Sequence, residues 1–165
     1  MARRLAVILA AALGMAAFVP LAAVAQTVVF GGIRADTSAE VQVSADSLTV
    51  DQTDGSAVFS GDVVVTQGEM RLAAAQVRVE YASDGQREIK QLLASGGVTL
   101  VSGGDAVQAD SAEYSILDGT IEMIGNVLLS QGGNVLSSER LTVNLVTGSA
   151  TATGRVQTTL RPGGN

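Results

Sequence analysis

Apolar and polar residues alternate one by one over much of the chain, and this period is typical of β-strands. In the segment 57–66, AVFSGDVVVT, the odd positions from Ala57 to Val65 are apolar or glycine. A period of two predicts strands with one buried face. The segment 121–129 repeats the pattern, whereas a helical period of 3.6 does not persist beyond the first 25 residues. The sequence therefore predicts an all-β fold.

The alternating segments belong to an internal repeat. Residues 43–84 align without a gap on residues 107–148, and each half splits again, which gives four units of about 29 residues. The pattern Gly-x-Val marks these units and begins at Gly61, Gly96, Gly125 and Gly154. A small residue and a polar residue precede each glycine, at Ala45-Asp46, Ala75-Gln76, Ala109-Asp110 and Ser138-Glu139. The second unit is longer, and its extra residues fall in 83–96.

The apolar positions around each small-polar pair are separated by an odd step. Val43 is followed by Leu48, and Val107 by Ala112, five residues later in both cases. In a regular strand an odd step turns the side chain to the opposite face. We therefore expect a bulge or corner at each Ala-Asp pair, with one extra residue there. A strand that turns a corner passes from one layer of a sandwich to the other.

Turn residues separate the alternating segments and predict hairpins. Asp-Gly pairs favour tight hairpin turns, and Thr-Gly occupies the corresponding place in the last unit. These turns are predicted at Asp54-Gly55, Asp84-Gly85, Asp118-Gly119 and Thr147-Gly148. The last predicted strand covers 156–160. The pattern as a whole predicts one antiparallel β domain over residues 26–165, in which each repeat adds a few short strands to its neighbour.

The first 25 residues have the composition of a secretory signal peptide. Arg3 and Arg4 precede an apolar run, and Ala23-Val24-Ala25 forms a small-x-small cleavage site before Gln26. An uncleaved membrane anchor is the alternative, because the run is nearly long enough to span a bilayer. The cleavage site favours a signal peptide over residues 1–25 and an exported protein.

Composition excludes several classes of function. The chain has no cysteine, histidine or tryptophan, and its formal charge of -6 becomes -8 once Arg3 and Arg4 are removed. Ser–His–Asp triads, Cys–His pairs and His or Cys metal sites are therefore impossible. An acidic chain without a basic stripe is a poor partner for nucleic acid. We expect neither an enzyme nor a cofactor.

Two repeated carboxylates, Asp46 and Asp110, leave a choice between chemistry and structure. Paired carboxylates could serve acid–base catalysis or bind calcium. Their position at each expected corner favours a structural role, as short acceptors for backbone N–H groups nearby. No metal is expected there.

The inward-facing residues are small for a sandwich core. They are mostly Val, Ala, Leu and Ile, with Phe59 and Tyr114 as the clear aromatic members. A close-packed, valine-rich core is one interpretation. The other is an apolar slot between two layers that do not fully meet, which would hold a lipid chain at about 0.8 kcal/mol for each buried methylene.

The two ends of a stacked repeat raise a similar choice. Terminal strands carry unpaired N–H and C=O groups, and the sequence has neither a disulfide nor a proline in a terminal strand to protect them. Short, twisted ends could suffice. Alternatively, another chain adds edge to edge and continues the sheet.

The segments ADSLTV, VFSGDVVVTQG and AAAQVRV, within residues 45–79, resemble the signature of a known family. The chain is similar to the LptA/OstA-like family of periplasmic lipopolysaccharide export proteins, over essentially all of its mature length. This resemblance implies a V-shaped antiparallel β-jellyroll, built from repeated short hairpins and open at both ends. It also implies a groove that shields the acyl chains of lipid A.

The resemblance places lipid contact at Val41, Val43, Phe59 and Leu100. Alternation along the strands extends the expected groove lining to Val50, Val63, Val65, Val79, Val98, Tyr114, Met123, Val127, Leu129 and Val143. Ordinary packing is the alternative role for each of these side chains.

The resemblance further implies partners and a mechanism. The expected partners are lipopolysaccharide through its lipid A, an LptC-like inner-membrane protein, an LptD-like outer-membrane receptor and further copies of the chain stacked end to end. Acyl chains would slide along the groove while sugars and phosphates stay in solvent. Two rival functions remain: an LptC-like component that keeps its N-terminal anchor, and a structural β-repeat protein that binds no lipid.

Overall fold

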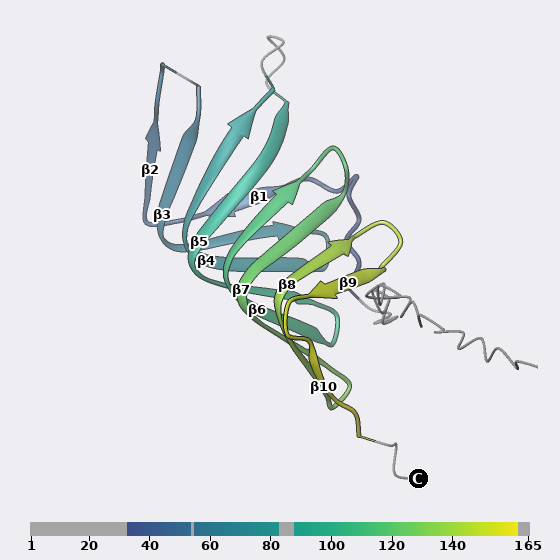
Figure 1. Ribbon diagram of the computed structural model, residues 1–165. Helices are drawn as coiled ribbons and strands as arrows, with labels where there is room; N and C mark the ends of the chain where they lie inside the picture. The colour runs from purple at the N-terminus through teal and green to yellow at the C-terminus, as the bar shows by residue number, and fades with distance from the viewer. Residues whose placement is uncertain (1–32, 54, 83–87, 162–165) are drawn as a thin grey trace, which may run out of the picture.

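The computed structural model describes residues 33–53, 55–82 and 88–161, and these residues form ten β-strands and no helix (Figure 1). The strands are β1 (Gln42–Ser44), β2 (Ser47–Val50), β3 (Ala57–Gln67), β4 (Met70–Tyr81), β5 (Ile89–Ser102), β6 (Asp105–Ser115), β7 (Thr120–Gln131), β8 (Asn134–Asn144), β9 (Ala150–Thr153) and β10 (Gln157–Thr159). The all-β prediction is confirmed. The predicted signal peptide 1–25, Asp54 and Asp84-Gly85 lie outside the described residues.

All strand pairs are antiparallel, and from β3 to β8 each strand pairs with the next strand in the chain. The order is β1-β3-β4-β5-β6-β7-β8-β10, with β2 also paired to β3 and β9 to β8. The predicted strands 57–66 and 121–129 lie within β3 and β7, and the predicted strand 156–160 contains β10. The predicted turns at Asp118-Gly119 and Thr147-Gly148 lie between β6 and β7 and between β8 and β9.

Each long strand bends near its middle, and the bends of neighbouring strands form one continuous corner (Figure 1). At this corner Gly61 and Asp62 of β3 lie opposite a single residue of β4, Ala75. The same two-against-one arrangement places Gly96 and Gly97 opposite Asp110, and Gly125 and Asn126 opposite Glu139. Both residues of each of these three Gly-x pairs have a positive φ, from 42° to 84°. An extra residue of this kind bends the strand that carries it.

The corner lies where the sequence predicted it, but the extra residue is on the other strand. We expected the extra residue within each Ala-Asp pair, whereas the structure places it in the Gly-x pair of the adjacent strand. The Ala-Asp strands keep their apolar residues inside by exposing two consecutive residues at the bend. In β4 these are Ala75 and Gln76.

In the second repeat, the single corner residue lies one position earlier in the chain than the sequence alignment predicted. Ala75, and not Gln76, corresponds to Asp46 and Asp110, because Ala75 is the residue that lies against a corner glycine. A Cβ atom added to Gly96 would lie 2.6 Å from the Ala75 Cβ, just as one added to Gly125 would lie 2.4 Å from Asp110 Oδ2. The second repeat therefore has a corner without a carboxylate.

The corner divides the sheet into two layers that diverge from it. Layer A contains the strand halves that end in the turns 68–69, 103–104 and 132–133, and layer B contains the halves that end in the turns 116–119 and 145–149. We call the side where the free ends of the two layers face each other the mouth. The sheet itself begins with β1 and β2, the N-terminal edge, and ends with β9 and β10, the C-terminal edge.

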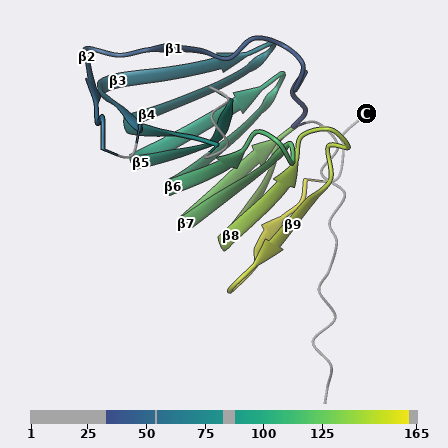
Figure 2. The same ribbon diagram turned by 90° about the horizontal axis from the view of Figure 1, so that it is seen from above.

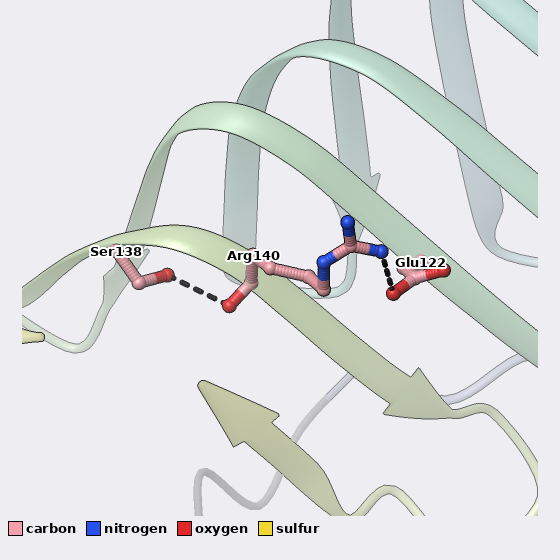
Figure 3. Close-up of polar contacts among 3 residues, drawn as sticks. All are labelled: Glu122, Ser138 and Arg140. Atoms are coloured by element: carbon pink, nitrogen blue, oxygen red, sulfur yellow. Dashed lines mark hydrogen bonds and ion pairs between the residues drawn. The ribbon is translucent and has the colours of Figure 1, made fainter. Parts of the chain in front are cut away.

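Polar contacts of the buried Ser138 and the exposed Arg140 lie at the bend of β8 (Figure 3). The Ser138 hydroxyl donates a hydrogen bond of 3.1 Å to the Arg140 carbonyl across the bend. The Arg140 side chain forms an ion pair with Glu122 of β7, and this hydrogen-bonded carboxylate raises the pKa of the arginine. Because both side chains are partly exposed, solvent screens the pair and its effect on stability is small.

Candidate functional site

The inner faces of the two layers form one apolar interior, and most predicted groove residues lie in it. The buried members, each at most 2% exposed, are Val63, Val65, Val79, Val98, Leu100, Tyr114, Met123, Val127, Leu129 and Val143. They come from layer A and layer B alike. The alternation in the sequence therefore predicted the inward face of these strands correctly, while lipid contact remains a prediction.

The predicted groove residues near the N-terminal edge are less covered. Val41, Val43 and Phe59 are partly buried against the core. Val50, which was also predicted to line the groove, is 58% exposed. It lies on the inner face, opposite the buried Ala57, but β2 is an edge strand and no further strand lies beside it. The interior is therefore open to solvent at this edge.

Sequence reasoning missed several residues of the same interior. Met70, Leu92 and Leu145 are buried, at 0–3% exposure, and belong to the core. The strand alternation contained the signal for the first two. Leu48, which is 54% exposed, is the inner-face neighbour of Val50 on β2, and the odd step from Val43 had already marked it as inward.

The two layers pack closely beside Tyr114. The cavity between the layers beside Tyr114 has a volume of about 10 Å³, which is close to the smallest space that holds one water molecule. Of the two interpretations that the composition left open, the packing beside Tyr114 favours the close-packed core. An acyl chain can enter only if part of the structure moves.

Among the described residues, Gln67 is the most buried of the polar side chains, and it lies near the mouth. Gln67 is 1% exposed, and its side-chain carbonyl accepts a hydrogen bond of 2.5 Å from the Tyr114 hydroxyl. Its amide donates to the backbone carbonyls of Thr37 and Ala39, at 3.2 and 3.1 Å. Burial raises the pKa of the Tyr114 phenol, although the hydrogen bond to Gln67 acts in the opposite direction. The sequence marked Gln67 only as a repeated residue.

The repeated carboxylates take part in the corner. Asp110 accepts a hydrogen bond of 2.8 Å from the Asn126 amide, and Glu139 accepts one of 2.9 Å from the Arg155 guanidinium. Their partners are side chains on the next strand, where we had expected backbone N–H groups. No group of three or more metal-ligating side chains occurs among the described residues. These contacts favour the structural role.

Membrane insertion through a helix has no support in the described part of the chain. None of its residues forms a helix long and apolar enough to cross a bilayer.

Comparisons with known proteins agree with this architecture. The family described as LptA/(LptD N-terminal domain) LPS transport protein matches residues 42–149. An uncharacterised protein of Rhizobium meliloti is 30% identical over 141 residues, which are 79% of this chain and 76% of that protein. The lipopolysaccharide export system protein LptH of Pseudomonas aeruginosa is 27% identical over 140 residues, or 79% of each chain.

A solved structure has the same fold. The crystal structure of LptH, the LptA homologous periplasmic component of the lipopolysaccharide transport device of Pseudomonas aeruginosa, superposes with a TM-score of 0.69. The match covers 78% of this chain and 99% of that chain, at 20% sequence identity. The bent, two-layered sheet is therefore a shared fold.

Proposed function

The chain belongs to the family of LptA and LptD N-terminal-domain lipopolysaccharide transport proteins, and we propose that it shields the acyl chains of lipopolysaccharide between its two layers. The predicted signal peptide 1–25 would deliver it to the periplasm. The anionic head group would remain in solvent, away from an acidic surface. No catalytic step forms part of this proposal.

The observation that carries the proposal is the apolar interior shared by both layers. Valine, leucine and methionine side chains face each other from every long strand, and Gln67 and Tyr114 supply the polar contact near the mouth. Such a surface offers an acyl chain about 0.8 kcal/mol for each methylene removed from water. It also lacks a fixed ionic contact, so it can release what it holds.

Photocrosslinking tests this proposal with a matched control on one strand. Leu100 is 1% exposed and faces the interior, whereas its neighbour Val101 is 37% exposed and faces outward. A photoreactive residue at Leu100 should crosslink to lipopolysaccharide in cells, and one at Val101 should not. Equal crosslinking at both positions, or none at Leu100 in a folded protein, contradicts the proposal.

We also propose that copies of the chain stack end to end and bridge LptC-like and LptD-like partners. Two kinds of strand alternate along the sheet. One kind carries a Gly-x pair at the corner, and the other carries the single residue that lies opposite this pair. The strands with a Gly-x pair are β3, β5, β7 and the β9–β10 segment. The strands with a single corner residue are the β1–β2 segment, β4, β6 and β8. The N-terminal edge is thus of one kind and the C-terminal edge of the other. A second copy would continue both the alternation and the antiparallel order.

Charge supports the same polarity of stacking. In this alternation, each Gly-x pair as a whole lies opposite the single corner residue of the following strand. At the C-terminal edge the pair is Gly154-Arg155, and the Arg155 side chain is 89% exposed although it forms an ion pair with Glu139 of the same copy. At the N-terminal edge the single residue is Asp46, and its carboxylate has no hydrogen bond or ion pair within the described residues. Stacking would place Arg155 of one copy opposite Asp46 of the next.

A further inference from the structure

The segment before β1 crosses the mouth of the molecule. Residues 33–39, which we call the strap, run past the free ends of the strands on the side opposite the corner (Figure 2). The strap has no regular secondary structure. It joins β1 at the N-terminal edge, and its far end reaches the turn 145–149 near the C-terminal edge.

The strap binds layer B through backbone groups of the last turn. The Arg34 guanidinium donates a hydrogen bond of 3.2 Å to the Thr147 carbonyl, and the Ala35 N–H donates one of 3.3 Å to the Leu145 carbonyl. A Cβ atom added to Gly119 would lie 3.4 Å from the Thr37 methyl group. The strap therefore lies close against two turns of this layer.

The strap also binds layer A. The Ser102 hydroxyl donates a hydrogen bond of 2.6 Å to the Arg34 carbonyl, and the Gln67 amide donates to the Thr37 and Ala39 carbonyls. The contacts of Arg34 with Thr147 and Ser102 are by themselves enough to connect the strap to both layers. Gln67 in turn is hydrogen-bonded to Tyr114 in layer B, so this contact links the strap to the interior.

One side chain of the strap lies inside the molecule. Ile33 is 2% exposed and belongs to the hydrophobic core, although it comes from a segment outside the sheet. It occupies space at the mouth that would otherwise be available to an apolar guest. The backbone of the strap thus crosses the mouth, and the Ile33 side chain fills space inside it.

The mouth is the side of the molecule that can open most readily. At the corner the strands run continuously from one layer to the other, so separation there would break the sheet. The strap is held by a few isolated hydrogen bonds and by the burial of Ile33, and none of these contacts belongs to a β ladder. Release of the strap would uncover the interior while the sheet stays intact.

We propose that the strap is a removable cover of the acyl-chain site, and that it leaves the mouth when lipopolysaccharide enters from the side. This inference rests on the proposed function. It explains how an interior with about 10 Å³ of free space beside Tyr114 can accept an acyl chain. When the strap leaves, Gln67 loses two backbone partners but gains access to water, so its amide does not remain buried without a partner.

A reversible disulfide tests the strap directly. The Asp36 Cβ lies 3.5 Å from a Cβ added to Gly68, the turn between β3 and β4, and this distance suits a disulfide. The chain has no cysteine of its own, so the variant D36C/G68C forms one defined bond. The oxidised variant should take up fluorescently labelled lipopolysaccharide at least ten times more slowly than the same protein after reduction. Wild-type protein should be unaffected by the reductant.

A release variant provides the opposite change. Ile33→Ser weakens the burial that holds the strap, and it should speed uptake several-fold, with circular dichroism confirming the β fold. Equal uptake by the oxidised and reduced forms of D36C/G68C, with wild type still loading lipid, overturns the strap and leaves the proposed function intact. If wild type loads no lipid and shows no crosslink at Leu100, the proposed function fails, and the strap proposal fails with it.

Discussion

At the scale of single residues, the corner depends on glycines that lie directly against the neighbouring strand. Gly125 has a φ of +80°, and a Cβ atom there would lie 2.4 Å from Asp110 Oδ2. Gly97 has a similar φ of +84° but has no atom within 4 Å of its would-be Cβ. The two positions therefore separate backbone strain from steric overlap.

We expect Gly125→Ala to lower the free energy of unfolding by about 2–3 kcal/mol and Gly97→Ala by about 1 kcal/mol. Both variants carry the cost of a positive φ in an alanine, and only the first adds an overlap with Asp110. Urea unfolding followed by circular dichroism measures the difference. If the two alanine variants lose the same stability, close packing at the corner does not contribute.

At the scale of elements, alternation was sufficient to predict strands and their inward faces. The pattern in 57–66 became β3, and the buried residues from Val63 to Val143 followed the predicted parity. The odd step revealed the corner, since an apolar residue cannot change face in a regular strand. The same step also contained the signal for Leu48.

Other features of the elements could not be predicted from alternation, because they depend on the neighbouring strand. The apolar positions stay inside whichever of the two paired strands carries the extra residue. Alternation along the sequence therefore does not show whether the bulge lies at Gly61-Asp62 or at Ala75. Exposure of Val50 depends on the absence of a strand beside β2. The contacts of the strap join residues far apart in sequence, such as Arg34 and Thr147, and no local pattern encodes them.

The edge strands should differ from the central strands in hydrogen exchange. Every residue of β2 and β10 is exposed, whereas β4 to β7 are paired on both sides. In dilute protein we expect rapid amide exchange in β2 and β10 and slow exchange in β4 to β7. Raising the protein concentration should protect β2 and β10 selectively if copies stack. Mass spectrometry of peptic peptides measures both effects, and edge protection that does not change with concentration contradicts stacking.

At the scale of the whole molecule, the proposed stacking requires the two ends to complement each other in shape and in charge. The corner continues through the interface only if the β9–β10 segment of one copy meets the β1–β2 segment of the next. Arg155 then faces Asp46, and the same contact is absent from a head-to-head or tail-to-tail pair. An ion pair of this kind sets orientation and register more than it adds affinity.

Charge reversal tests that polarity. Arg155→Glu removes the ion pair with Glu139 of the same copy and places like charges at the proposed junction, so we expect about tenfold weaker self-association by analytical ultracentrifugation at low salt, with a smaller effect at high salt. Asp46→Lys should weaken association similarly, and the double variant should restore it because the two charges have exchanged places. Arg71→Glu, an equal change of charge on the exposed face of β4, serves as the control and should leave association unchanged. A double variant that associates no better than either single variant would place the junction elsewhere, because only residues that face each other across the interface can compensate in this way.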